Sequence, residues 1–462
     1  MKVLGPFLII SLVLASPAAL DAQSVLTFPR VLTAAEMPLT GYAVVNPTPE
    51  AANVLFSLYS TSGNSAGNFS VSVRPGGQIS RLASELFPRA TAGWVQVTSD
   101  TNGLRGFWLG GDFVNFADGA EAASGVNEFV FPLVSGNAEI DIVNPTAESG
   151  AVLIRLIGAD GRETSDPEVA FLLPHGSYRS KSAGAFQLTD LSRATHAKVT
   201  CLVPCAGTLL LGDYLVSPSL AVVNGVSTTS AGTTLNFAHV VQGPLDGLNY
   251  STTLSLASLK GTAQSVLITF TPSDGTPAIT VQRDIEKNGA LNDTVKAIFN
   301  LPDTFQSGWI KVVAAAPIAG SVVYAEAVQR GSAVTPGLAQ ASSSMVLAHI
   351  ADLGIWQTGL AMLNPGDVEA SIELFAIAPD GGLIGQIVQP IILPPGTNVA
   401  KLLREWIPQT AQRTTDGGFV FLRSTVPIVA IELFFTRDLK VLSNVPAFGL
   451  PPTQSFTPPR PN

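Results

Sequence analysis

The chain contains 462 residues, of which 46% are apolar and only 13% are charged, and its formal net charge is −9. Because the charges are sparse, net acidic and not gathered into Lys or Arg runs, the sequence argues against a nucleic-acid-binding surface and against long-range attraction to anionic lipid. The 42 glycines and 33 prolines are spread along the chain, which favours many short strands and turns over long, charged surface helices.

The N-terminal segment, MKVLGPFLIISLVLASPAALDAQS, has the parts of a secretory signal peptide. Lys2 supplies the positive charge, residues 3–15 form the apolar stretch, and small residues continue to Ala22, after which we expect cleavage. No later stretch reaches the roughly 18 unbroken apolar residues of a membrane-spanning helix. We therefore expect residues 1–22 to be removed and the mature chain to be secreted, extracellular or periplasmic, without a membrane span.

A set of short landmarks recurs in the same order along the chain, as expected for a repeat protein. The first landmark is an Asn-Pro pair, which occurs in AVVNPT at 43–48, DIVNPT at 141–146 and AMLNPG at 361–366. A turn glycine follows 17 residues after each Asn, and a turn of Pro-Gly type ends 31 or 32 residues after it. These glycines are Gly63, Gly161 and Gly381 for the first turn and Gly77, Gly176 and Gly396 for the second.

The interval between the second and third copies is long enough for a degenerate fourth. There LSLAS at 254–258 replaces the Asn-Pro segment, and counting from Ala257 places Asp274-Gly275 and Asn288-Gly289 at the two turns. The sequence thus predicts four homologous units at 23–120, 126–223, 234–332 and 345–449. The Gly-, Ala-, Ser- and Thr-rich segments 117–125, 224–234 and 332–344 are predicted to be linkers, and the Pro-rich tail 450–462 is predicted to be disordered.

The strand after each Asn-Pro turn alternates apolar with polar residues, as a half-buried β-strand does. Its inward positions are Val54, Phe56 and Leu58; Val152, Ile154 and Leu156; Val266, Ile268 and Phe270; and Ile372, Leu374 and Ala376. We expect the Asn-Pro pair to end the preceding strand, because proline cannot donate to a ladder and Asn can bond its own backbone in a turn.

The predicted fold is all-β, with four tandem immunoglobulin-like antiparallel β-sandwich domains of about seven or eight short strands each. A short helical turn ending near Pro88, Pro302 and Pro408 is expected to close one end of a unit.

This pattern resembles the tandem repeats of about 100 residues found in predicted secreted bacterial proteins. Those repeats carry a strand ending in an Asn-Pro turn, a later Asp-Gly turn, a Pro-Gly turn and a Gly-Trp strand. The resemblance covers nearly the whole mature chain, and it implies the fold and an exported location without implying an activity.

The residue types that carry chemistry are few. Cys201 and Cys205 are the only cysteines and flank CLVPC, where one strand turns into the next. In an exported protein we expect a disulfide between them, and the alternative is a redox pair, although the spacing is not Cys-x-x-Cys.

The four histidines lack metal-ligand spacing. His239 and His349 occupy matched positions in the opening strands of the third and fourth units, which favours structural roles, and His175 in the Pro-Gly-type turn is expected to be solvated. The Gly-x-Ser-x-Gly pattern at 63–67 lies at a strand-to-strand turn, so a hairpin loop is favoured over a nucleophile elbow. No cofactor and no metal are predicted.

The tryptophans are the remaining candidates for ligand contact. Trp94 and Trp309 are matched between units and are expected to pack in the interior. Trp108 and Trp356 have no matched aromatic, so they are the candidates for stacking on a sugar ring from an exposed position.

Two functions remain from these observations. The first is a non-enzymatic structural or interaction protein, adhesion-like or a spacer, with four units in a row that contact an unknown protein or glycan at the cell surface. Its low charge and mean hydropathy of +0.35 favour surfaces that associate. The alternative is a carbohydrate-binding accessory protein that uses Trp108 and Trp356. A hydrolase would need carboxylates that meet in space.

Overall fold

The computed structural model describes residues 24–135, 138–180, 193–212, 220–328, 330–415, 417–451 and 456–459. The predicted signal peptide at 1–22 lies outside these residues. The strands pair in antiparallel ladders and the helices are only three to five residues long, so the prediction of an all-β fold is confirmed. In the described ranges, no helix combines the length and the apolar character needed to cross a membrane.

Every ladder between named strands lies within one of four consecutive segments, which we call units 1 to 4 and which span 24–121, 126–227, 232–336 and 342–449. Unit 1 contains β1 (Ser24–Leu32), η1 (Met37–Leu39), β2 (Thr40–Val45), β3 (Ala52–Tyr59), β4 (Ser65–Val73), β5 (Gln78–Leu82), α1 (Ala83–Leu86), β6 (Gly93–Ser99), β7 (Arg105–Gly111) and β8 (Ala117–Glu121). Unit 2 contains β9 (Val126–Phe131), β10 (Ala138–Val143), β11 (Gly150–Ile157), β12 (Glu168–Leu172), β13 (Ser177–Arg179), β14 (His196–Gly212), β15 (Leu220–Asn224) and β16 (Val226–Ser227).

The other two units follow the same order of elements. Unit 3 contains β17 (Gly232–Leu245), β18 (Leu248–Ser258), β19 (Gln264–Pro272), β20 (Ile279–Ile285), β21 (Ala290–Thr294), α2 (Val295–Phe299), β22 (Gln306–Glu326) and β23 (Ser332–Pro336). Unit 4 contains β24 (Ser342–Leu347), β25 (Trp356–Leu363), β26 (Ala370–Ile377), β27 (Leu383–Gln386), β28 (Ile391–Leu393), β29 (Asn398–Leu402), α3 (Leu403–Trp406), η2 (Pro408–Gln412), β30 (Phe419–Thr436) and β31 (Leu442–Gly449). The short helices α1, α2 and α3 confirm the predicted helical turns.

The units differ in how one strand connects the two sets of paired strands. In unit 1, β6 belongs to the sheet β1-β6-β3-β4 and β7 to the separate sheet β5-β2-β7-β8. In units 2, 3 and 4 a single long strand, β14, β22 or β30, pairs with one set along its first half and with the other set along its second half. The chain therefore follows the same path through every unit, whether this strand is continuous or divided into two.

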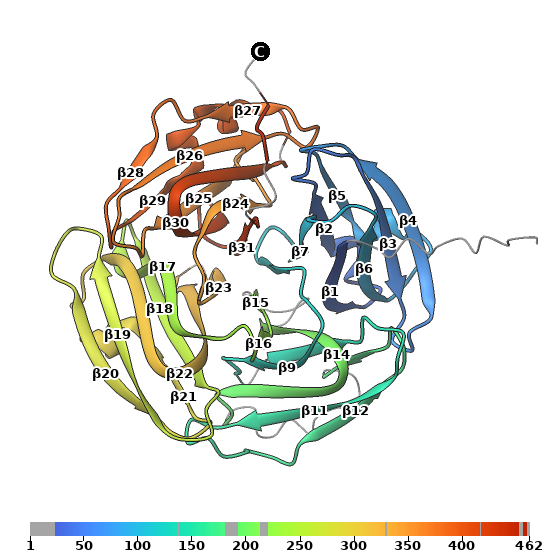
Figure 1. The fold of residues 1–462 in the computed structure, drawn as a ribbon, viewed down its shortest axis with the longest axis horizontal. Helices are drawn as coiled ribbons and strands as arrows, with labels where there is room; N and C mark the ends of the chain where they lie inside the picture. Colours follow the sequence, from blue (N-terminus) through green and yellow to red (C-terminus); the bar gives the residue numbers. More distant parts are fainter. Residues whose placement is uncertain are drawn as a thin grey trace, which may run out of the picture.

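The four units follow one another around a ring, and unit 4 lies beside unit 1 (Figure 1). Residues far apart in sequence meet at this closure, since the side-chain amide of Gln78 donates to the Ala348 carbonyl and accepts from the Gly418 backbone at 2.7 Å each. The expectation of four units in a row is corrected accordingly.

Four strands near the C-terminal ends of the units form the centre of the ring. We call β8, β15, β23 and β31 the hub; each of these strands contacts the next, and β31 contacts β8. The linker predictions for 117–125, 224–234 and 332–344 are wrong where they cover strands, namely β8, β16, β23 and the first residues of β17 and β24. At the axis, Ala117, Gly119 and Ala333 are small enough for close approach and are buried.

The interior of each unit follows the predicted alternation. All twelve inward positions expected in the strands after the Asn-Pro turns are at most 3% exposed, which confirms that part of the prediction. A fully buried large aliphatic or aromatic side chain contributes roughly 1.5–3 kcal/mol, so these positions help to stabilise each unit.

The Asn-Pro turns do more than end a strand. Asn46 is fully buried; its Oδ1 accepts from the Thr48 backbone at 3.1 Å, and its Nδ2 donates to the carbonyls of Glu50 at 2.7 Å and Val73 at 3.0 Å. Asn144 and Asn364 make the equivalent bonds. One amide therefore fastens its own turn to the strand that leads into the Pro-Gly turn.

In unit 3 the residue that replaces this Asn is Ser258, one position after Ala257, the residue from which the two turns of this unit were counted. The ladders decide this, because Leu256 pairs with Gly320 as Val44 pairs with Gly106. The Gln264 amide donates to the Ser258 hydroxyl at 2.9 Å and so supplies part of the missing hydrogen bonding.

Candidate functional site

Neighbouring units meet at equivalent joints, each made by the first turn of one unit and the second turn of the next. At Gly63 in unit 1 the chain has a φ of +85°, and an added Cβ would lie 1.9 Å from the Pro174 carbonyl oxygen of unit 2. Gly161 lies equally close to Lys287 of unit 3, and Gly381 lies against Gly76 of unit 1. The landmark glycines therefore permit contact between units.

One backbone hydrogen bond recurs at three of these joints. Ser177 N donates to Thr61 O at 3.0 Å, Ala290 N to Ala159 O at 3.2 Å, and Gln78 N to Pro379 O at 2.9 Å. At the joint between units 3 and 4, a side-chain bond of 2.9 Å from the Ser273 hydroxyl to Asn398 Oδ1 joins the same two turns.

A ring N–H reinforces three joints. Trp94 Nε1 donates to the His175 carbonyl at 2.8 Å, and Trp309 Nε1 donates to the Gly396 carbonyl at 3.1 Å. His196 occupies the matched position in unit 2 and has a hydrogen bond with the Asn288 backbone. The two tryptophans are buried, as expected, but their polar edges serve the contact with the next unit.

His175 itself lies in the joint rather than in solvent. Its ring stacks on Tyr59 of unit 1, with centroids 4.3 Å apart and an interplanar angle of 8°. The expectation of a solvated His175 is therefore corrected.

The joint between units 4 and 1 contains aromatic packing that involves the C-terminal segment 450–462. Phe419 holds the matched position in unit 4 and packs on Phe456, with ring centroids 5.8 Å apart. Leu450 and Phe456 belong to the segment expected to be disordered, yet both are buried.

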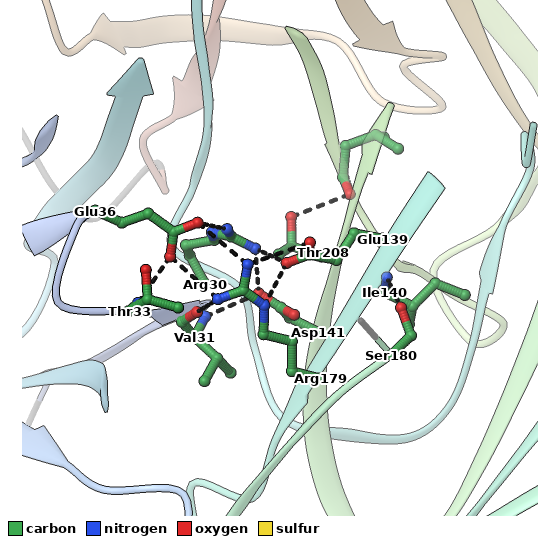
Figure 2. Close-up of polar contacts among 11 residues, drawn as sticks. Arg30, Val31, Thr33, Glu36, Glu139, Ile140, Asp141, Arg179, Ser180 and Thr208 are labelled. Carbon is green, nitrogen blue, oxygen red and sulfur yellow. Dashed lines mark hydrogen bonds and ion pairs between the residues drawn. The ribbon is translucent and has the colours of Figure 1, made fainter. Parts of the chain in front are cut away.

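The joint between units 1 and 2 also contains a buried charged cluster, which we define as Arg30, Glu36, Glu139, Asp141 and Arg179 (Figure 2). Arg30 comes from β1 and is fully buried; its guanidinium contacts Glu36 at 2.5 Å, Asp141 at 2.8 Å and also Glu139. Arg179 approaches from β13 and contacts Glu36 at 3.1 Å and Glu139 at 2.8 Å. Two units thus share one ion network.

The ionisation of this cluster is governed by burial and by its partners. Burial opposes the charged form of Arg30, but Asp141, Glu139 and Glu36 together raise its pKa. Burial raises the pKa of Asp141 to about 7, against the opposing effect of Arg30. The guanidinium is therefore permanently charged and depends on the carboxylates around it.

Other residues occupy the Arg30 position in the remaining units. In the first strand of unit 1, Arg30 lies two residues after Phe28, which pairs with Val95 of β6. The residues two positions after the equivalent paired residue in units 2, 3 and 4 are Leu133, His239 and His349. Burial lowers the pKa of both His239 and His349 to about 4. His349 packs on Phe107 of unit 1, with ring centroids 5.4 Å apart. The joints that contain His239 and His349 are therefore filled by neutral rings, and the joint that contains Leu133 by an aliphatic side chain.

Another buried carboxyl, that of Asp118 in β8, holds the hub together. Its Oδ2 accepts from the Val222 backbone at 2.7 Å, and its Oδ1 accepts from the Ser443 hydroxyl at 2.8 Å and the Asn444 backbone at 3.2 Å. Burial raises the pKa of Asp118 to about 8, while these hydrogen bonds lower it. One side chain therefore connects units 1, 2 and 4.

Cavities also occur at the ring. A cavity of about 430 Å³ lies beside the hub and receives wall residues from all four units, among them Ala120, Asn224, Gly320 and Asn444. Its wall includes Glu121, which the sequence did not single out.

The outer surface of unit 2 carries a group of exposed apolar side chains, which we call the unit 2 stripe and define as Val169, Phe171, Leu173 and Leu202. Their exposed fractions are 66%, 68%, 47% and 77%. Val169 and Phe171 lie on one face of β12, which pairs only with β11 among the described strands and so forms an edge. Ala151 of β11 pairs with Phe171 of β12, and the next residue of β11, Val152, pairs with Cys201, which directly precedes Leu202 in β14. Phe171 and Leu202 therefore lie on either side of Ala151.

The predicted glycan residues do not form a platform together. Trp108 is 0% exposed in the core of unit 1, so the prediction that its ring stacks on a sugar is corrected: both faces of the indole are covered by protein. Trp356 is half-buried and packs on Phe434, with ring centroids 5.9 Å apart. The two residues lie in different units.

Cys201 and Cys205 are both buried and both are free thiols in the structure. A side-chain hydrogen bond between them and burial both raise the pKa of the Cys205 thiol. They lie close enough to interact, and the disulfide between them stays a prediction for the protein in an oxidising compartment.

Two carboxyl groups do meet in unit 4, as a hydrolase would require. Asp352 accepts from Arg404 at 2.6 Å, and burial, with a smaller effect of Asp352, raises the pKa of Glu432. Both acids are closed off from solvent, with exposed fractions of 1% and 0%, so no substrate reaches them in this conformation. Over the described ranges, no group of three or more His, Cys, Asp or Glu could hold a metal ion.

Comparison with known proteins gives little beyond this geometry. No protein-family model matches the sequence, and no curated protein matches it. Among solved structures, the chain is similar to the crystal structure of Thermotoga maritima 1070, with 13% sequence identity and a TM-score of 0.21. The match covers 23% of this chain and 94% of that chain.

Proposed function

We propose that the chain is an exported, non-enzymatic interaction protein, in which four immunoglobulin-like β-sandwich repeats act as one rigid scaffold. The N-terminal signal sequence supports export, and the resemblance to tandem repeats of secreted bacterial proteins agrees with it. The joints support a rigid scaffold, because three of them contain backbone hydrogen bonds between units and the joint between units 3 and 4 contains the side-chain bonds of Ser273 and Trp309.

The unit 2 stripe is the observation that carries the interaction role. Exposed Val169 and Phe171 on an edge strand are unfavourable in a monomer, since they leave apolar area in water and backbone groups unpaired. Contact with a second sheet or an extended protein segment would satisfy both needs. The partner is accordingly a protein surface, and the glycan alternative retains only half-buried Trp356.

This proposal predicts that the stripe drives association. We expect the wild-type chain to associate as its concentration rises in sedimentation velocity, and to be retained on the surface of its source cells. Replacing Phe171 and Leu202 by Ser should abolish both, because the apolar contact area is lost. Val388→Ser is the matched control, since Val388 is an apolar residue that is 91% exposed in unit 4.

A monodisperse wild-type monomer without cell retention would contradict the interaction role. So would Phe171→Ser/Leu202→Ser variants that associate as the wild type does, provided that their unfolding curves are unchanged.

A further inference from the structure

The cavity beside the hub has the size of a small-molecule site. Its volume of about 430 Å³ lies within the range of roughly 300–1,000 Å³ that is usual for ligand pockets. Residues such as Ala120, Ala319 and Gly320 leave this space open, because larger side chains at the ring axis would fill it. Part of the wall is apolar, formed by Leu235, Ile318 and Val334.

Glu121 is the only charged residue on the wall of this cavity within the described chain. It ends β8 and is half-buried. Burial raises the pKa of Glu121 to about 7, and no charged neighbour contributes to the shift. A carboxylate here has lost part of its hydration without gaining a cation, which is an unfavourable state in the unoccupied protein.

A second acceptor lies next to Glu121. The Asn224 Nδ2 donates to the Glu121 backbone carbonyl at 2.7 Å. Because a carbonyl can only accept, this bond fixes the nitrogen of the Asn224 amide on that side and the oxygen on the other. The Asn224 Oδ1 is buried and has no hydrogen-bond partner among the described residues, which is unfavourable when it stays unsatisfied.

We propose that this cavity binds a small organic ammonium ion, with the ammonium group between Glu121 and Asn224 Oδ1 and the hydrocarbon part against Leu235, Ile318 and Val334. An ammonium group has three donors and no acceptor, and it therefore fits a site that offers a carboxylate and an unsatisfied amide oxygen. A divalent metal fits less well, because calcium takes six to eight oxygen ligands and commonly several carboxylates. The site is independent of the unit 2 stripe.

Phenethylammonium is a suitable probe, because it combines one ammonium group with an apolar ring. Saturation-transfer NMR and calorimetric titration of the full chain should show one binding site for phenethylammonium. The neutral analogue 2-phenylethanol and the anion 3-phenylpropionate should bind at least about tenfold more weakly, since neither supplies a charge-assisted donor to Glu121.

The pH dependence gives an independent readout. The cation binds the ionised carboxylate, so its affinity should fall as the pH decreases below about 7, the pKa of Glu121 in the folded chain. Well below that value the loss should approach about tenfold per pH unit.

Two variants test the assignment. Glu121→Gln should weaken phenethylammonium binding roughly tenfold to a hundredfold and remove its pH dependence, whereas Glu148→Gln, at an exposed acid of unit 2, should leave both unchanged. Ala339→Phe, at the cavity wall, should block binding by filling the space. Circular dichroism verifies that each variant is folded.

The proposal is overturned if 2-phenylethanol binds as tightly as phenethylammonium, if folded Glu121→Gln retains the affinity, or if no probe binds the wild type. Stoichiometric calcium binding that depends on Glu121 would also overturn it.

Discussion

Replacing Arg30 by Met should lower the free energy of unfolding by about 3–5 kcal/mol, as expected when one partner of a buried ion network is removed. The variant leaves Glu139 and Asp141 buried without the fully buried guanidinium that contacts both. Urea denaturation at pH 7 measures the loss. It should shrink as the pH falls towards 5, because Asp141, whose pKa burial already raises, loses the opposing effect of Arg30 and becomes protonated in the folded state.

Two controls separate this effect from a general loss of charge. Arg423→Met removes an exposed pair with Glu373 and should cost less than about 1 kcal/mol. The variant Arg30→Met/Glu139→Gln/Asp141→Asn removes the stranded charges and should be more stable than Arg30→Met alone. If Arg30→Met and Arg423→Met lose similar stability, the charged cluster does not hold the joint.

Replacing Gly63 by Ala should destabilise the joint between units 1 and 2. The loss in free energy of unfolding should exceed the cost of placing Ala in the left-handed backbone conformation of Gly63. The new Cβ would lie 1.9 Å from Pro174 O, and a backbone carbonyl cannot move aside without opening the joint. Gly275→Ala is a matched control, because Gly275 is the same landmark in unit 3, has a φ of +82° and has nothing within 4 Å of its added Cβ.

Both substitutions carry the cost of a left-handed backbone, roughly 1–2 kcal/mol. Gly63→Ala should cost about 1–3 kcal/mol more than Gly275→Ala, the range expected for overpacking. Gly161→Ala repeats the test at the next joint, since its Cβ would lie 1.8 Å from Lys287 O. Equal losses at Gly63 and Gly275 in thermal or urea unfolding would mean that the turn contact is absent in solution.

Strand periodicity and turn landmarks predicted much of the fold within a unit. The alternation that placed Val54 and Phe56 inside depends on local chain geometry, so it is visible in sequence. The ring is not visible in this way, because its joints depend on backbone carbonyls and on glycine positions that look like ordinary turns. The segment at Ala117 resembled a linker because it lacks large side chains, and this lack is what allows it to lie at the axis.

The charged cluster and the hub are also not predictable from the sequence of a single unit, for a related reason. Arg30 stands in an apolar strand, and a single charged residue there is compatible with an exposed position until the next unit supplies Glu139 and Asp141. A comparison of matched positions would have given a signal, since Arg30 aligns with Leu133 and His349. Trp108 was misplaced because β7 is buried on both faces, and such strands lack the alternation that marks the inward side.

Small-angle X-ray scattering of the mature chain tests the closed ring most directly. Without residues 1–22 of the 462-residue sequence, a compact chain should have a radius of gyration of about 22 Å from chain-length scaling, and the closed ring predicts a value close to this with a compact distance distribution. Four units of about 13 Å radius of gyration placed end to end would give about 40 Å. A value near 40 Å with an elongated distribution would contradict the ring, and with it the joints and the hub cavity.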